Sequence, residues 1–180
     1  MARIVIITGA AGTGKTSICE ILADNSTYDC AAHIKYDDFN DFIRKGFVKP
    51  WMDGARNQNE TVIGALAESA KRFSKGGYEV FVDGVITPNF LDPWIEMADK
   101  GFDFRYIVLR PDVQTTVMRA AEREQNIHYP LKSEFVKKTC CYFANMGKYE
   151  SHVIDTSLDT LDENVKFIQK ILSDNIFSII

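Results

Sequence analysis

The sequence has no long hydrophobic run, no basic segment and no regular spacing of cysteines. None of its apolar stretches approaches the roughly 18 residues of a membrane-spanning helix, so no association with a membrane is expected. The 25 acidic residues outnumber the 21 basic ones and give a net charge of −4, which makes nucleic acid a poor candidate partner. The 4 cysteines include no CxxC pair, which argues against a zinc or redox motif.

Linkers and repeats are also missing. No repeat, low-complexity stretch or segment rich in proline, glycine and serine divides the chain, and its length suits one α/β domain over residues 1–180. An apolar run at residues 4–7 follows Met1 almost directly and leaves no room for a signal peptide. Adjacent Cys140 and Cys141 are poorly placed for a disulfide, so we expect a reduced, cytoplasmic protein, either monomeric or homodimeric.

Short apolar runs alternate along the chain with segments of helical periodicity. The apolar runs predict strands at residues 3–8, 31–36, 78–82, 104–109 and 151–154. The intervening segments predict helices at residues 15–23, 38–45, 61–74, 89–99, 113–124, 133–146 and 161–172. Asp112 and Thr160 are suitable N-caps for the helices predicted at 113–124 and 161–172. Strands that alternate with helices predict a parallel sheet covered on both faces.

Polar residues follow each predicted strand. They are a glycine-rich loop, the pair Asp37 and Asp38, then Asp83, Arg110 and finally the segment 155–157. Ligands of parallel α/β sheets bind at the carboxyl ends of the strands, so these residues predict where the functional site lies.

The glycine-rich loop, residues 9–16 with sequence GAAGTGKT, matches G-x-x-x-x-G-K-[ST] between a predicted strand and a predicted helix. In this motif backbone N–H groups surround a phosphate, the lysine reaches the β- and γ-phosphates, and the hydroxyl ligates Mg²⁺. The residues predicted to bind nucleotide here are Gly9, Ala10, Ala11, Gly12, Thr13, Gly14, Lys15, Thr16 and Ser17. A dinucleotide-binding loop is disfavoured because its third glycine would fall at Ser17.

Motifs of other P-loop proteins are missing. Neither D-x-x-G nor N-K-x-D occurs, which argues against a regulatory GTPase. A small-molecule kinase needs only a nucleotide, a metal ion, an acceptor pocket and a lid.

The order of motifs resembles the small P-loop kinases around gluconate kinase, shikimate kinase and chloramphenicol phosphotransferase over nearly the whole chain. The resemblance is carried by the P-loop, the acid after the second strand, the pair Arg119 and Arg123, the segment 155–157, and a Gly-x-x-x-Pro-Trp at 46–51 that is similar to gluconate-kinase-like proteins of uncertain substrate. The GGG segment of shikimate kinases is replaced by VDGV at 82–85, so the identity of the acceptor is not carried over.

The resemblance implies a P-loop fold: a five-stranded parallel sheet of order 2-3-1-4-5 between helices, a lid at about 124–132 and an acceptor-binding insertion at about 38–75. It also implies an ATP- and Mg²⁺-dependent transfer of the γ-phosphoryl group to a hydroxyl of a small molecule such as a sugar acid, a shikimate-like acid or an antibiotic. Two alternatives stay open: a nucleoside or nucleotide kinase, and a regulatory ATPase with little acceptor turnover.

Roles for individual residues follow from position and resemblance together. Asp37 is the predicted base that faces the acceptor hydroxyl, and Asp38 is the more suitable helix cap. Asp83 is predicted to hold Mg²⁺ through water, together with Thr16, on the substrate side of the site. Arg44, in the insertion, is a candidate acceptor ligand.

The arginines are assigned to the phosphates and the nucleotide. Arg119 and Arg123 are four residues apart on one helix face, which suits either a clamp on the transferring phosphoryl group or a solvated pair near acidic residues. Arg110 and Thr156 are predicted to contact the nucleotide, the latter in a loop that lies against adenine in relatives. The histidines, including His33, have no metal-ligand spacing and are interpreted as structural.

Overall fold

The computed structural model describes residues 1–124 and 133–178 and contains a five-stranded parallel sheet of order β2-β3-β1-β4-β5, which confirms the expected topology. The strands are β1 (Ile4–Gly9), β2 (Ala31–Lys35), β3 (Glu79–Gly84), β4 (Phe104–Leu109) and β5 (Val153–Ile154). The α-helices are α1 (Lys15–Asp24), α2 (Tyr36–Asp41), α3 (Arg56–Lys75), α4 (Asp92–Asp99), α5 (Val113–Glu124), α6 (Ser133–Tyr142) and α7 (Leu161–Ser173). Two 3₁₀ helices, η1 (Pro88–Phe90) and η2 (Gly147–His152), complete the described elements.

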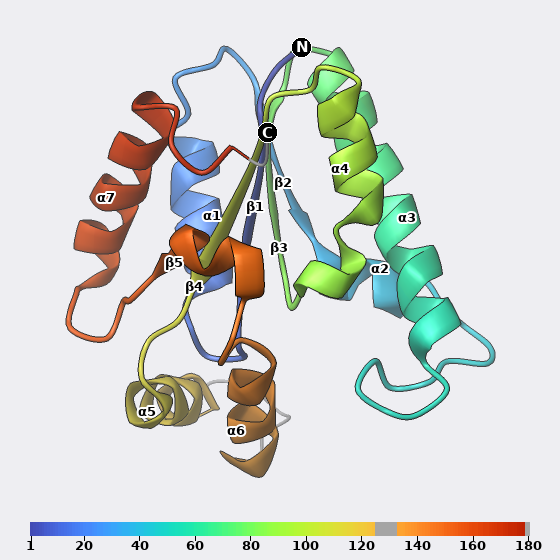
Figure 1. The fold of residues 1–180 in the computed structure, drawn as a ribbon, viewed down its shortest axis with the longest axis vertical. Helices are drawn as coiled ribbons and strands as arrows, with labels where there is room; N and C mark the ends of the chain where they lie inside the picture. The colour runs from blue at the N-terminus through green and yellow to red at the C-terminus, as the bar shows by residue number, and fades with distance from the viewer. Residues whose placement is uncertain (125–132, 179–180) are drawn as a thin grey trace.

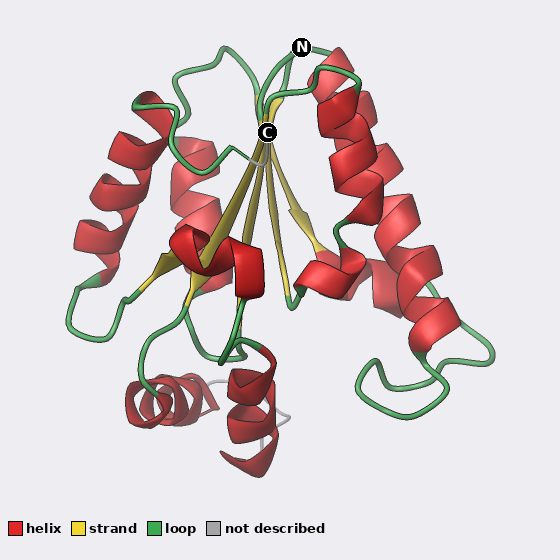
Figure 2. Cartoon of the chain, in the orientation of Figure 1, coloured by secondary structure: helices red, strands yellow, loops and turns green. Residues whose placement is uncertain are grey.

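Helices cover both faces of the sheet. Figure 1 shows α1 and α7 on one side, α3 and α4 on the other, and α5 and α6 beyond the carboxyl ends of the strands. The colouring by secondary structure in Figure 2 shows the strands fanning out between these layers. Of the described helices, none is long and apolar enough to cross a membrane.

The central strand β1 explains why the first apolar run is unbroken. All six of its residues are buried because both sheet faces are covered. Ile4 and Ile6 pack into the core beneath α3 and α4, whereas Val5 and Ile7 pack into the core beneath α1 and α7. Full burial of each such side chain contributes about 1.5–3 kcal/mol to the free energy of folding, so β1 stabilises the packing of the helices on both faces of the sheet.

Several element boundaries differ from the sequence prediction. Helix α2 ends at Asp41 instead of 45, because only Tyr36 and Asn40 are buried and little packing sustains a longer helix. Helix α3 begins at Arg56, five residues before the expected start, where Asn59 Nδ2 donates to the carbonyl of Pro50 at 2.8 Å. Strand β5 is reduced to two residues because η2 occupies the chain up to its start.

Two further differences concern α4, which precedes β4, and α6, which follows the expected lid. The expected helix at 89–99 is divided into η1 and α4, and proline occupies the first turn of each, the position where its missing N–H costs nothing. Helix α6 ends at Tyr142 rather than 146. The expected caps are confirmed: Asp112 Oδ1 accepts from the N–H of Thr115 at 2.8 Å, and Thr160 forms a capping box with Glu163.

Candidate active site

The P-loop joins β1 to α1 at the carboxyl ends of the strands. Gly14 is the N-cap of α1 and has φ 89° and ψ 9°, a left-handed conformation that favours glycine. Gly12 also has φ +89°, and a Cβ atom there would lie 2.7 Å from the carbonyl oxygen of Thr116 and 2.9 Å from the Cβ of Ala120. The loop is therefore packed directly against α5, and glycine is needed at position 12 for space as well as for conformation.

Polar contacts hold the loop in shape. Thr13 Oγ1 donates to the carbonyl of Ala10 at 3.0 Å, and Lys15 Nζ donates to the same oxygen at 2.7 Å. The N–H of Ala11 donates to Thr139 Oγ1 of α6 at 3.2 Å. The contact with Thr139 was not predicted, since 128 residues separate the two positions and no motif marks it. It ties the helix that follows the expected lid to the phosphate-binding loop.

The loop after β3 is fixed to β1 by a buried threonine. Thr8 Oγ1 lies 2.9 Å from the carbonyl of Gly84 and accepts from the N–H of Ile86 at 2.9 Å. A Cβ at Gly84 would lie 2.5 Å from the Cβ of Tyr36, so the end of β3 and the start of α2 are in contact. This packing brings Asp83 and Asp37 together at the carboxyl ends of β3 and β2, where the sequence predicted polar residues to gather.

Asp83 is a buried carboxylate beside the P-loop. It pairs in register with Ile7 of β1, and its Oδ2 lies 3.4 Å from Nε2 of His33 on β2. Burial opposes its ionisation, but interactions with His33 and with the Thr16 hydroxyl outweigh burial and hold the pKa of Asp83 below its usual value. Asp83 is therefore an anion next to the predicted Mg²⁺ ligand Thr16.

Asp37, in the first turn of α2, has a different environment. Water reaches its carboxylate, yet enough protein surrounds it that burial raises its pKa; the positive charge of Lys15 opposes this shift, and the negative charge of Asp83 adds to it. Asp38 is exposed in the same turn. The structure thus brings Lys15, Asp37 and Asp83 close enough to influence one another electrostatically.

A cavity of about 470 Å³ is bounded by the P-loop, α5 and α6. Its lining includes Ala10 and Thr13 of the loop, Arg110, and Asp155. The Arg110 guanidinium donates to the carbonyl of Phe143 at 3.2 Å and pairs with the Glu150 carboxylate. The cavity is large enough for a nucleoside, in the usual range of small-molecule sites.

Arg119 and Thr156 meet at the edge of this region. Arg119 Nη2 donates to the carbonyl of Thr156 at 2.9 Å and to that of Asp159 at 3.3 Å, so its guanidinium is directed at the loop after β5 in this structure. Thr156 itself is buried. The side chain of Arg123 and residues 125–132 of the lid expected at about 124–132 lie outside the described residues.

Arg44, the candidate acceptor ligand, lies outside α2 in this structure. It is exposed in the loop that follows the early end of α2, a consequence of that helix being shorter than predicted. The segment expected to bind the acceptor contains a groove of about 390 Å³ between α2 and α3. Its lining residues are Phe39, Phe42, Ile43, Asn57, Gln58, Thr61, Val62 and Ala65.

The sheet order, the P-loop and the carboxylates at the strand ends define a P-loop nucleotide-binding protein with the fold of the small kinases. A sequence family described as an AAA domain, AAA_18, matches residues 5–136, and the chain belongs to this family.

Solved kinase structures share the fold at low sequence identity. A gluconokinase from Sinorhizobium meliloti 1021 has a TM-score of 0.66 at 19% identity, with 94% of this chain and 91% of that chain covered. A sugar kinase from Janibacter sp. HTCC2649 has a TM-score of 0.70 at 14% identity, with 96% and 95% covered. The APS kinase of Mycobacterium tuberculosis, in complex with AMPPNP and APS, has a TM-score of 0.66 at 16% identity, with 96% and 98% covered. Comparison with curated proteins finds no match.

Proposed function

We propose that the protein is an ATP-dependent phosphotransferase that moves the γ-phosphoryl group to a hydroxyl of a small molecule. The observation that carries this proposal is the convergence of Lys15, Asp37 and Asp83 at the ends of neighbouring parallel strands, where the pKa of Asp37 responds to both other charges. A cation on the P-loop beside two carboxylates of opposite pKa shift suits phosphoryl transfer: one carboxylate remains ionised and the other is a stronger base.

In the proposed reaction the bond between the γ-phosphorus and the bridging oxygen of ATP breaks, and a bond to the acceptor oxygen forms. ADP leaves with the bonding pair, and the acceptor's hydroxyl proton passes to Asp37. A raised pKa makes Asp37 a better proton acceptor than an ordinary aspartate. Lys15 and the N–H groups of the loop neutralise the charge that is spread over the phosphate oxygens.

Thr16 and Asp83 are the residues that would hold Mg²⁺. A hydroxyl and an ionised carboxylate are hard oxygen donors, which is the ligand chemistry that this ion prefers, and the depressed pKa of Asp83 keeps its charge available. When bound, Mg²⁺ would neutralise negative charge on the β- and γ-phosphates.

On the nucleotide side, we assign the base and ribose of ATP to the cavity lined by Arg110. The hydrogen bonds of Arg119 to the loop at 156–159 support a role in shaping this nucleotide site. The clamp on the transferring phosphoryl group is then assigned to Arg123, with the lid at about 124–132 as the cover that excludes water.

On the acceptor side, the insertion at about 38–75 supplies α2, the following loop and α3. The groove between these helices is lined by the rings of Phe39 and Phe42 together with Gln58 and Thr61, whose polar groups already bond to the backbone of Val48 and Asn57. This mixture supports an acceptor that carries an apolar face as well as its reacting hydroxyl. Among the acceptor classes considered, an antibiotic or a cyclic acid fits this lining better than a linear sugar acid. Arg44 stays a predicted contact for an acidic group.

The proposal is tested by ADP release from Mg-ATP against a panel of sugar acids, shikimate-like acids, nucleosides, and phenicol and aminoglycoside antibiotics. Lys15→Ala and Asp37→Asn should abolish acceptor-dependent release, and the neighbouring Asp38→Asn is the matched control that should retain it. Turnover with nucleosides alone would identify a nucleoside kinase. Tight ATP binding with no stimulation by any acceptor would support a regulatory ATPase and overturn the proposal.

A further inference from the structure

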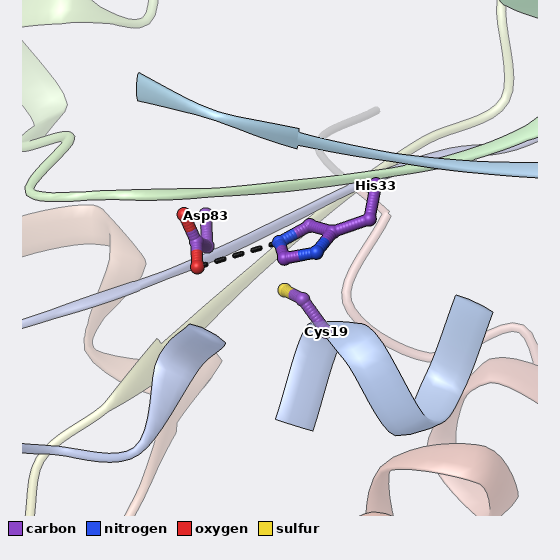
Figure 3. Close-up of side chains that lie close together, drawn as sticks. All are labelled: Cys19, His33 and Asp83. Carbon is purple, nitrogen blue, oxygen red and sulfur yellow. Dashed lines mark ion pairs between the residues drawn. The ribbon is translucent and has the colours of Figure 1, made fainter. Parts of the chain in front are cut away.

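Three side chains of different chemistry meet under the P-loop. Cys19 lies on α1, His33 on β2 and Asp83 on β3, and one potential ligand atom from each lies within 4.8 Å of the others. Figure 3 shows the Cys19 sulfur and the His33 ring directed at the same space, with the Asp83 carboxylate across from them. Sequence spacing gives no sign of this cluster. Cys19 and His33 are 14 residues apart and His33 and Asp83 are 50 residues apart, so the three do not form a local motif.

The fold explains why the three residues converge. In the parallel register His33 pairs with Phe81, two residues before Asp83, so their side chains project from the same face of the sheet. That face is covered by α1, where Cys19 is fully buried in the core shared with Phe81. Cys19 is also one helical turn beyond Thr16 and faces the same side as that residue.

The hydrogen bonding of the cluster is incomplete. Nε2 of His33 and Oδ2 of Asp83 face each other at 3.4 Å as an ion pair, but both atoms are buried and neither has a hydrogen bond of good geometry to any residue that the structure describes. The Asp83 side chain is only 7% exposed and that of His33 only 11%. Buried polar atoms without partners are costly in a folded protein, and a bound ion is one way to satisfy them.

We propose that Cys19, His33 and Asp83 form a binding site for a soft divalent transition-metal ion of the zinc class. Zinc binds thiolate at about 2.3 Å, imidazole at about 2.0–2.1 Å and carboxylate at about 2.0–2.2 Å, which places the ligand atoms of a tetrahedral site roughly 3.5 Å apart. The separation of 3.4 Å between His33 Nε2 and Asp83 Oδ2 matches that spacing. Because all three ligand atoms lie within 4.8 Å of one another, the Cys19 sulfur would have to move little more than about 1 Å to complete the site.

The donor set selects the ion. A thiolate and an imidazole suit zinc, cobalt or copper, whereas Mg²⁺ prefers oxygen donors in octahedral geometry and is not expected here. Three protein ligands leave a fourth position for water. Burial raises the pKa of the Cys19 thiol, so the thiolate forms as the ion binds: the sulfur–metal bond replaces the S–H bond, and the proton goes to solvent.

Binding at this site has a consequence for the proposed kinase, and this consequence alone rests on the proposed function. A zinc ion on Oδ2 of Asp83 would neutralise the carboxylate that is proposed to support Mg²⁺ beside Thr16, and its charge would repel that second dication. The zinc-loaded protein is therefore expected to lose acceptor-dependent activity, which makes the cluster an inhibitory metal site.

Metal binding is tested without nucleotide, so its failure and a failure of the kinase proposal are distinguishable. Co²⁺ is added to reduced, chelator-treated protein, and thiolate-to-cobalt charge-transfer absorption in the near ultraviolet is followed until Zn²⁺ displaces the cobalt. We expect one Co²⁺ per chain, displaced by Zn²⁺. Affinity should fall at least about 100-fold in Cys19→Ser, more than is typical for residues that only support a ligand.

Two further variants make the outcome decisive. The absorption band should persist when Cys30, Cys140 and Cys141 are all replaced by serine, and it should weaken in His33→Gln, which tests the site even if Cys19→Ser does not fold. A band that persists in Cys19→Ser and disappears in the triple serine variant would overturn the site. So would the lack of any thiolate band in the unmodified protein.

Discussion

The contact between the P-loop and α5 leads to a quantitative prediction for Gly12→Ala. The new Cβ would lie 2.7 Å from the carbonyl oxygen of Thr116, at a residue with φ +89°. The left-handed backbone costs an alanine roughly 1–2 kcal/mol, and overpacking typically costs about 1–3 kcal/mol. We expect the free energy of unfolding to fall by roughly 2–5 kcal/mol in total. Urea denaturation followed by circular dichroism measures this change.

Two other glycines separate the parts of that estimate. Gly14 has the same φ of +89°, but no atom of residues 1–124 or 133–178 lies within 4 Å of an added Cβ, so Gly14→Ala should cost only the backbone part, roughly 1–2 kcal/mol. Gly64 lies within α3 and also has open space, so Gly64→Ala should raise stability by roughly 0.5–1 kcal/mol. If Gly12→Ala is no more destabilising than Gly14→Ala, the packing of α5 on the loop is refuted.

Three further predictions concern the site. Burial raises the pKa of Asp37 in the folded state, so the contribution of this residue to stability is fully present below its unfolded pKa and is lost as the pH rises through its folded pKa. Asp37→Asn should therefore melt at a higher temperature than the unmodified protein at pH 7. In thermal scans this difference should shrink below about pH 4. Arg119→Ala should raise the Kd for ATP roughly tenfold in titration calorimetry through loss of its bonds to the loop at 156–159, and a fall in kcat at unchanged Kd would instead assign it to the phosphoryl clamp. Thr139→Val should leave the N–H of Ala11 without its acceptor and cost about 1–3 kcal/mol, seen as faster hydrogen exchange at Ala11; unchanged exchange would contradict the contact.

The features that local sequence determines were the ones predicted best. The P-loop was identified because its glycines, Lys15 and Thr16 are contiguous and are flanked by a strand and a helix. The strand order came from family resemblance, since alternation of strands and helices specifies parallel pairing but not which strands are neighbours. The structure confirms that order.

Features that depend on tertiary contacts were missed or misplaced. The hydroxyl of Thr139 and the cluster around His33 join residues far apart in the sequence, and no periodicity reports such contacts. The predicted bounds of α2 failed because a short amphipathic pattern does not show whether a partner surface continues beyond Asp41. For the same reason Arg44, expected inside this helix, lies in the loop that follows it.

Asp37 is proposed to take the proton of an acceptor hydroxyl during transfer of the γ-phosphoryl group. The most direct measurement is a single-turnover assay that follows labelled γ-phosphate from ATP onto the acceptor, in the unmodified protein, in Asp37→Asn and in Asp38→Asn. We predict that Asp37→Asn slows transfer by about 10²–10⁴-fold at unchanged ATP affinity, while Asp38→Asn transfers at nearly the unmodified rate. Labelled acceptor that forms equally fast in Asp37→Asn would contradict the account.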